Sequence, residues 1–154
     1  MPITYRIFPA SDMTYADWSG RITNEMVVEN FQAYLSDPLY RAGRTELVDL
    51  SGIEAMDLRF PDLARLSSTV NAQPFNGSTG TLTSICAPGD VAWGLSRMYE
   101  SMASLQEGIV LRLSRTELGA LQALGRSETT VAEFLDALQR AENGAPPVPE
   151  AKAG

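Results

Sequence analysis

Hydrophobic and polar residues alternate at the start of the chain. In "ITYRIFPA" (residues 3–10), Ile3, Tyr5 and Ile7 occupy every second position, a period that is typical of a β-strand. A second short strand is expected at 13–20. The residues between the two segments include proline, serine and aspartate, which favour a turn. The pattern therefore predicts an antiparallel hairpin.

The period of the pattern changes to that of a helix after residue 23. Thr23 is expected to cap this helix, and Pro38 to end it, because the residue before a proline disfavours helical geometry. The apolar face of the helix would consist of Val27, Phe31, Tyr34 and Leu35.

Apolar strand segments and helical segments alternate along the rest of the chain. Strands are expected at 45–52, 81–88 and 108–114. Helices are expected to begin near Pro61, after Pro88, after Thr116 and at residue 129. This order predicts an α/β fold: an N-terminal hairpin, then βα units, with helices packed on a mixed sheet of about five strands.

The length of 154 residues suits a single domain, which we place at residues 1–142. Residues 143–154 are rich in Pro, Ala and Gly and lack apolar periodicity, so a disordered tail is expected there. No apolar run is long enough to span a membrane, and the first residues do not resemble a signal peptide. A cytoplasmic location is the simplest interpretation.

The chain is acidic, with a formal net charge of −7 and a pI of about 4.5. Its basic residues are scattered, whereas nucleic-acid binding depends on clustered Lys and Arg. Nucleic acid is therefore not expected as a partner. The single cysteine, Cys86, excludes an internal disulfide, and its apolar strand predicts a buried side chain.

The segment "LVDLSGIEAMDLRFPDLARL" (47–66) resembles the signature region of STAS domains, the bacterial anti-sigma factor antagonist fold. In those domains, a strand ending in Asp-Leu-Ser/Thr-Gly leads to Asp-Ser-Ser-Gly and a helix. The connector Asp37-Pro38-Leu39-Tyr40-Arg41-Ala42-Gly43 is similar to the one in the poorly characterised SpoIIAA-like proteins. The resemblance spans roughly residues 3–115 and implies a STAS-like mixed sheet.

The sequence departs from the STAS pattern at the position of the phosphorylation switch. Asp57 keeps the aspartate of the motif, but Leu58 and Arg59 replace the two serines, and Phe60 replaces the glycine. No hydroxyl remains there to accept a phosphate at the start of the helix. A kinase-controlled cycle at this position is therefore not expected, although Arg59 would suit an anion from a partner or ligand.

The composition removes several classes of catalytic site. There is no histidine, so the commonest general base near neutral pH is missing, as are the Ser-His-Asp and Cys-His pairs. One cysteine and no histidine cannot form a zinc site of the usual kind. No glycine-rich nucleotide-binding motif is present. We therefore expect neither an enzyme, nor a cofactor, nor a metal.

The remaining candidate functional residues lie in the strand expected at 45–52 and in the segment after it. We select Asp49, Ser51, Asp57, Arg59 and Phe60 as a candidate interaction or ligand loop. Asp49 would lie near the carboxyl end of its strand, where open α/β sheets place ligands. The simpler interpretation is structural: Asp49 would bond nearby backbone, Ser51 and Gly52 would form a turn, and Asp57 would serve the turn before the helix.

Three functions follow from these observations. The first is a non-enzymatic interaction or regulatory module, with a protein partner or self-association as a homodimer. The second is a carrier of a small apolar or anionic, lipid-like ligand, because SpoIIAA-like proteins resemble the lipid-carrying Sec14 fold. A long apolar cavity lined by the first and third helices would favour this alternative. The third function is an enzyme, which would require Asp49 and Asp57 to converge in one pocket.

Overall fold

The computed structural model describes residues 2–71, 81–103 and 109–145. The strands are β1 Ile3–Phe8, β2 Met13–Thr23, β3 Thr45–Asp57, β4 Thr81–Cys86 and β5 Ile109–Ser114. They form one sheet in the order β1-β2-β3-β4-β5. The β1–β2 pair is antiparallel and the other pairs are parallel. The predicted α/β fold with a five-stranded mixed sheet and an N-terminal hairpin is therefore confirmed at this level.

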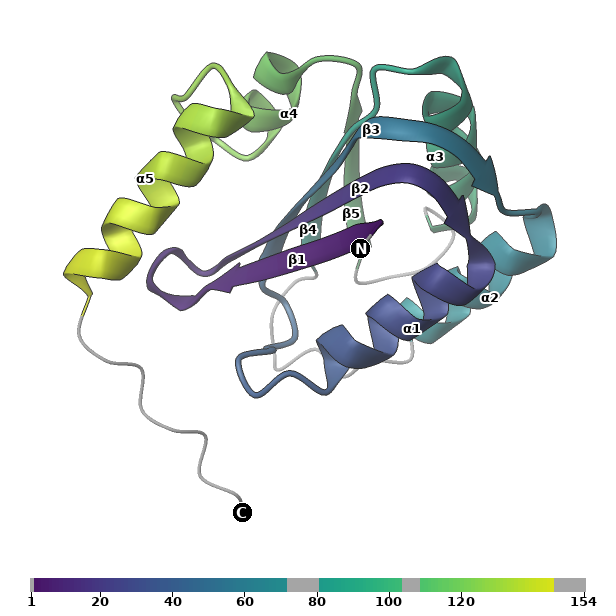
Figure 1. The fold of residues 1–154 in the computed structure, drawn as a ribbon, viewed down its shortest axis with the longest axis horizontal. Coiled ribbons are helices and arrows are strands. Elements are labelled where there is room, and N and C mark those ends of the chain that lie inside the picture. Colours follow the sequence, from purple (N-terminus) through teal and green to yellow (C-terminus); the bar gives the residue numbers. More distant parts are fainter. Residues whose placement is uncertain (1, 72–80, 104–108, 146–154) are drawn as a thin grey trace.

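Helices cover both faces of the sheet, as Figure 1 shows. The helices are α1 Asn24–Leu35, α2 Phe60–Asn71, α3 Asp90–Ala103, α4 Glu117–Ala123 and α5 Val131–Gly144, with a short 3-10 turn, η1, at Pro9–Ser11. Helix α1 contacts β1 and β2, α3 contacts β3 and β5, and α2 packs against α3. Helix α4 contacts β4 and β5 on the other face, and α5 contacts β1 and η1.

The face under α4 and α5 holds a densely packed core. Phe8, Leu47 and Cys86 from the strands meet Phe134 and Leu138 from α5, and all five are 0–1% exposed. The burial of Cys86 confirms its predicted place in the core. The opposite face is shared between two smaller apolar clusters under α1, α2 and α3, and this difference leaves room for the cavity described below.

Threonine hydroxyls cap three of the helices. Thr23 accepts a hydrogen bond from the backbone N–H of Met26, which confirms the predicted start of α1. Thr116 and Thr130 cap α4 and α5 in the same way. Gly125 follows α4 with φ of +71°, a left-handed conformation that costs glycine little and ends a helix.

Strand β3 is longer than predicted. It runs from Thr45 to Asp57, so the expected turn at Ser51 and Gly52 is wrong. Gly52 instead pairs with Ser19 of β2, next to an irregularity in the register. A Cβ atom on Gly52 would lie 2.9 Å from the Cβ of Ser19. The glycine therefore allows two strands to approach closely, whereas the sequence pattern suggested a turn.

The predicted tail lies mostly outside the described residues. Helix α5 continues to Gly144, two residues beyond the predicted end of the domain. The rest of the expected tail, 146–154, is not among the described residues. Within the described ranges, no helix combines the length and the apolar character needed to cross a bilayer.

Candidate functional site

A cavity of about 200 Å³ lies between the sheet and the helices α1 and α3. Leu63 and Leu66 of α2 also line it. Arg41, in the connector after α1, is exposed and belongs to the lining, so the cavity reaches the surface on that side. Most of the lining surface is apolar, but polar side chains contribute from the strands, from the connector and from both helices, including Asn30 of α1 and Ser96 of α3. This composition is typical of binding sites for small organic molecules.

Alternate residues of three parallel strands form the floor of the cavity. Thr14 of β2, Glu46 of β3 and Thr83 of β4 are neighbours in one row across the sheet. The next row contains Ala16, Val48 and Ile85, which complete the apolar part of the floor. Because side chains alternate between faces along a strand, the polar row and the apolar row share one face.

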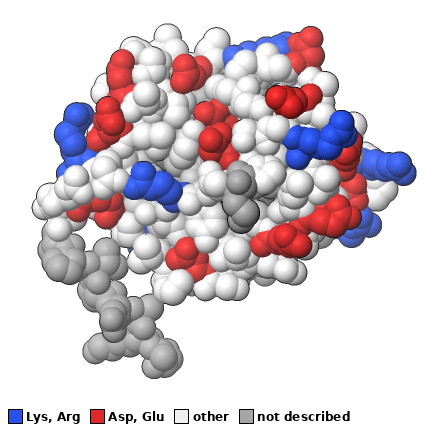
Figure 2. Space-filling view, in the orientation of Figure 1, with Lys and Arg blue, Asp and Glu red and all other residues white. Residues whose placement is uncertain are grey.

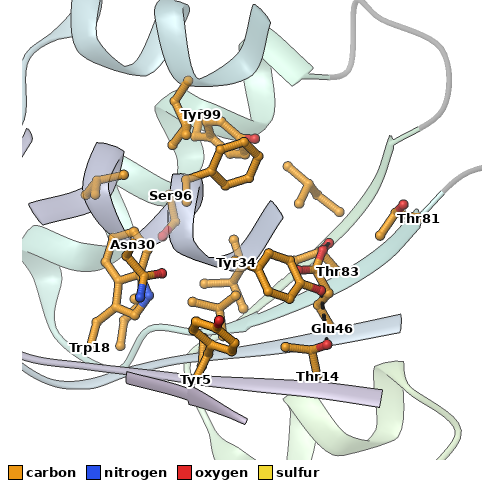
Figure 3. A pocket seen from close by; sticks show the side chains of 18 of the residues that line it. Tyr5, Thr14, Trp18, Asn30, Tyr34, Glu46, Thr81, Thr83, Ser96 and Tyr99 are labelled. Atoms are coloured by element: carbon orange, nitrogen blue, oxygen red, sulfur yellow. Dashed lines mark hydrogen bonds between the residues drawn. The ribbon is translucent and has the colours of Figure 1, made fainter. Parts of the chain in front are cut away.

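Tyrosine rings enclose one end of the cavity. The rings of Tyr5 and Tyr34 meet edge to face with centroids 5.1 Å apart, and Tyr34 and Tyr40 do so at 5.0 Å. Tyr99 of α3 lines the cavity as well, as Figure 3 shows. Burial raises the pKa of Tyr34 and of Tyr99, and the nearby carboxylate of Glu46 raises both further. These phenols therefore stay neutral across the physiological pH range.

Glu46 is the polar centre of the floor. Its Oε1 accepts a hydrogen bond of 3.2 Å from the Thr83 hydroxyl (Figure 3). The Tyr34 hydroxyl also bonds the carboxylate. The Tyr34 hydroxyl lies 3.0 Å from that of Thr14. Burial raises the pKa of Glu46 from 4.5 to about 7, while the two hydrogen bonds oppose the shift. Glu46 therefore changes its charge near neutral pH.

Arg44 is a buried cation at the edge of the same cavity. The residue is 7% exposed. Its Nη1 lies 2.9 Å from Oδ1 of Asp12, and its Nη2 donates to the carbonyl of Leu39 at 3.2 Å. The Nε atom has no hydrogen-bond partner among the described residues. Asp12 also pairs with Arg41, so a single carboxylate serves two guanidinium groups at this corner.

Asp49 and Ser51 lie on the opposite face of the sheet from the cavity. The Ser51 backbone N–H and hydroxyl donate to Oδ1 of Asp49 at 3.0 and 2.5 Å, and the Tyr15 hydroxyl donates to Oδ2 at 3.0 Å. These bonds agree with the structural interpretation of Asp49. Because β3 continues to Asp57, Asp49 lies within the strand, and the expectation that it lies near the carboxyl end is wrong.

Asp57, Arg59 and Phe60 form a separate group where β3 passes into α2. Asp57 is the last residue of β3, and its carboxylate pairs with Arg21 of β2 at 2.9 Å. Arg59 and Phe60 are exposed, and 60% of Phe60 is accessible. Six residues of extended strand, roughly 20 Å, separate Ser51 from Asp57. The structure therefore divides the predicted loop into two groups, and Asp49 and Asp57 do not converge in one pocket.

Glu46 is not among the carboxylates that the sequence analysis selects. A signal for it is present in "TELVDLSG", because Glu46 shares a strand face with Val48 and Leu50. A carboxylate in line with two apolar residues indicates an acid on a buried face. The pattern gives no information on the helices opposite, so it does not distinguish a packed face from a cavity.

The charged side chains of the described residues are mixed over the surface in view. On the face drawn in Figure 2, acidic side chains are spread widely and basic ones stand between them, without a continuous basic patch among the residues described there. Within the described part of the chain, no three Cys, Asp or Glu side chains are grouped to hold a metal ion.

No protein-family model matches the sequence, and no curated protein matches it.

Proposed function

We propose that the protein binds a small, mostly apolar molecule between the sheet and the helices α1 and α3. The observation that carries the proposal is the cavity itself, which has an apolar wall and one row of polar groups on its floor. An apolar cavity under the first and third helices is also the feature that favours ligand carriage in the sequence analysis. We propose binding without catalysis.

The size of the cavity limits the ligand. Its volume of about 200 Å³ exceeds the roughly 150 Å³ of a cavity that holds benzene. It is smaller than the roughly 300–1,000 Å³ of pockets for drug-sized molecules. The ligand is therefore about the size of a single substituted ring or a short alkyl chain, and a complete two-chain lipid does not fit in it.

The proposal is tested by titrating the protein with benzyl alcohol, an apolar probe of this size, by calorimetry and NMR. Ala16 lies on the cavity floor, so Ala16→Leu adds three carbon atoms in the space of the ligand. We expect this change to weaken binding by roughly tenfold or more, since a methylene in a pocket is worth about 10- to 200-fold. In the NMR titration, chemical-shift changes should appear at the residues that line the cavity.

Ala33→Leu is the matched control, because Ala33 is exposed on α1 and does not line the cavity. It should leave the affinity for benzyl alcohol unchanged. Thermal unfolding of both variants verifies that they are folded. Absence of binding to the wild type, or equal binding to wild type and Ala16→Leu, would contradict the proposal.

A second candidate function is an interaction module that self-associates. It is supported by the exposure of Phe60, which is 60% accessible beside the exposed Arg59 at the start of α2. Val28 of α1 is 43% exposed and lines a groove between α1 and α2. Exposed apolar residues near such a groove are a common feature of protein interfaces.

A further inference from the structure

We propose that the ligand of the cavity is a small primary amine, bound as its ammonium form, with Glu46 as the counter-ion and the apolar wall around its body. This inference rests on the proposed function and specifies the chemical class of the ligand. It is carried by three observations: the position of Glu46, its lack of an ionic partner among the residues that the structure describes, and the tyrosine rings around it.

Glu46 lines the cavity from the middle of the sheet. Its neighbours in the row are Thr14 and Thr83, which are uncharged, and the rest of the nearby floor is apolar. The residue keeps intermediate exposure, although it lies in a central strand, because it lines the cavity. A group that enters the cavity can therefore reach the carboxylate directly.

Among the described residues, no basic side chain forms an ion pair with Glu46. The twelve basic residues comprise arginines in the described part of the chain and one lysine, Lys152, outside it. The nearest candidate, Arg44, is paired with Asp12. Buried charges in proteins are normally paired, so the missing cation is a role that a ligand can fill.

The groups that face Glu46 suit a cation. Tyr34 from α1, Tyr40 from the connector and Tyr99 from α3 are near enough for the charge of Glu46 to raise the pKa of each. All three are neutral at pH 7, and Arg44 is held by Asp12. Aromatic ring faces attract ammonium groups. The net charge of −7 also favours the approach of a cation over that of an anion.

The protonation of Glu46 gives the interaction a specific pH dependence. Burial raises its pKa to about 7, whereas an alkylammonium resembles Lys and keeps its proton to about pH 10. The ion pair therefore forms only where Glu46 is ionised. Between about pH 6 and pH 8, the ionised fraction rises from roughly a tenth to nine tenths, so the affinity for an amine should rise about ninefold.

The test compares benzylamine, benzyl alcohol and benzoate, three probes of nearly equal size, by calorimetry with the full chain. At about pH 8, we expect benzylamine to bind roughly tenfold more tightly than benzyl alcohol, because a charge-assisted hydrogen bond is the stronger one. Its affinity should rise from about pH 6 to pH 8, while that of benzyl alcohol should stay constant. Ala16→Leu should weaken the binding of both probes.

Glu46→Gln keeps the shape and the acceptor of the side chain but removes its charge. It should abolish both the preference for benzylamine over benzyl alcohol and the rise of the benzylamine affinity with pH. Glu54→Gln is the matched control, because Glu54 is exposed on the same strand and does not line the cavity. It should behave as the wild type, and the pH profile of the wild type tests the inference independently of either variant.

The outcomes separate this inference from the proposed function. Equal binding of benzylamine and benzyl alcohol would overturn the amine assignment and leave the cavity as an apolar site. A preference for benzoate would also overturn it, and would transfer the ionic role to Arg44, whose Nε has no partner among the described residues. If none of the three probes binds, both the inference and the proposed function are contradicted.

Discussion

Glu46 and Asp49 lie three residues apart on β3 and face opposite sides of the sheet. Asp49 is 9% exposed and accepts three hydrogen bonds, two from Ser51 and one from Tyr15. Glu46 receives bonds from Thr83 and Tyr34 and borders a cavity. At the scale of the residue, the same chemical group is therefore structural on one face and available to a ligand on the other.

The raised pKa of Glu46 predicts how the stability of the protein depends on pH. The pKa rises from 4.5 to about 7 on folding, so the unfolded chain loses this proton first as pH increases. The stabilisation is complete below about pH 4.5 and is lost as pH rises through about 7. Relative to Glu46→Gln, the wild type should lose about 2–3 kcal/mol of unfolding free energy between about pH 5 and pH 8.

Urea denaturation of both proteins at the two pH values measures this difference. Glu54→Gln, on the exposed part of β3, serves as the control and should follow the wild type. Identical pH slopes for the wild type and Glu46→Gln would show that the carboxyl titrates as it does in the unfolded chain.

Asp49 and Asp57 are predicted to differ in their contribution to stability. Asp49→Ala leaves Ser51 and Tyr15 without their common acceptor, and we expect a loss of about 2–3 kcal/mol, since partly buried donors lose their partner. Asp57→Ala removes an exposed ion pair with Arg21 and should cost about 0–1 kcal/mol. Chemical denaturation compares the two, and similar losses would contradict the structural role of Asp49.

At the scale of the element, β3 is the centre of the molecule. It pairs with β2 over the length of both strands and with β4 over its first half, and it contributes to the cavity floor and to the core on the other face. Its continuation past Gly52 brings Asp57 beside Arg21 and starts α2 at Phe60. The position of the exposed Phe60 therefore follows from the length of this strand.

Substitution of two glycines tests the continuation of β3. Gly52→Ala places a Cβ 2.9 Å from the Cβ of Ser19, and we expect a loss of about 1–3 kcal/mol from this overpacking. Gly94→Ala in α3 meets no atom within 4 Å and should stabilise the helix by about 0.5–1 kcal/mol. Urea denaturation measures both, and a neutral Gly52→Ala would favour a turn over a paired strand at this position.

At the scale of the whole molecule, the sheet separates a closed face from an open one. Helices α4 and α5 cover one side, and α1, α2 and α3 cover the other (Figure 1). The first side holds a packed core, and the second holds the cavity. Phe60 and Val28 belong to the α1 and α2 side. Ligand binding and self-association, the two proposed functions, would therefore both involve these helices.

Self-association through the start of α2 is predicted to depend on Phe60. Phe60→Ser removes the most exposed large apolar side chain in the described part of the chain. If a dimer forms through this residue, the variant should weaken it by roughly tenfold or more, as is typical of a central aromatic contact. Sedimentation velocity over a wide concentration range measures the change, with Arg59→Glu as a second variant at the same surface.

Val91→Ser is the control for this experiment, because Val91 is also exposed, at 55%, but belongs to α3. It should leave the association unchanged. A wild type that stays monomeric at every concentration would contradict self-association and leave ligand binding as the remaining proposal.

Local patterns in the sequence determine most of the elements. The alternation at 3–10 and the cap at Thr23 each depend on neighbouring residues, so they were predicted where the structure places them. The mixed sheet follows from the opening hairpin and the alternation of strands and helices, whereas the order of the strands in the sheet comes from the structure. The resemblance to STAS-like domains remains a prediction.

Contacts between segments that are distant in the sequence decided the length of β3 and the presence of the cavity. The local sequence at Ser51 and Gly52 favours a turn, but pairing with β2 extends the strand through both residues. The cavity exists because α1 and α3 do not fill the space above Thr14, Glu46 and Thr83. The sequence by itself therefore determined the elements and their order, since these depend on short-range periodicity. Only the tertiary structure decided which carboxylate faces an open space, because that depends on side chains far apart in the chain.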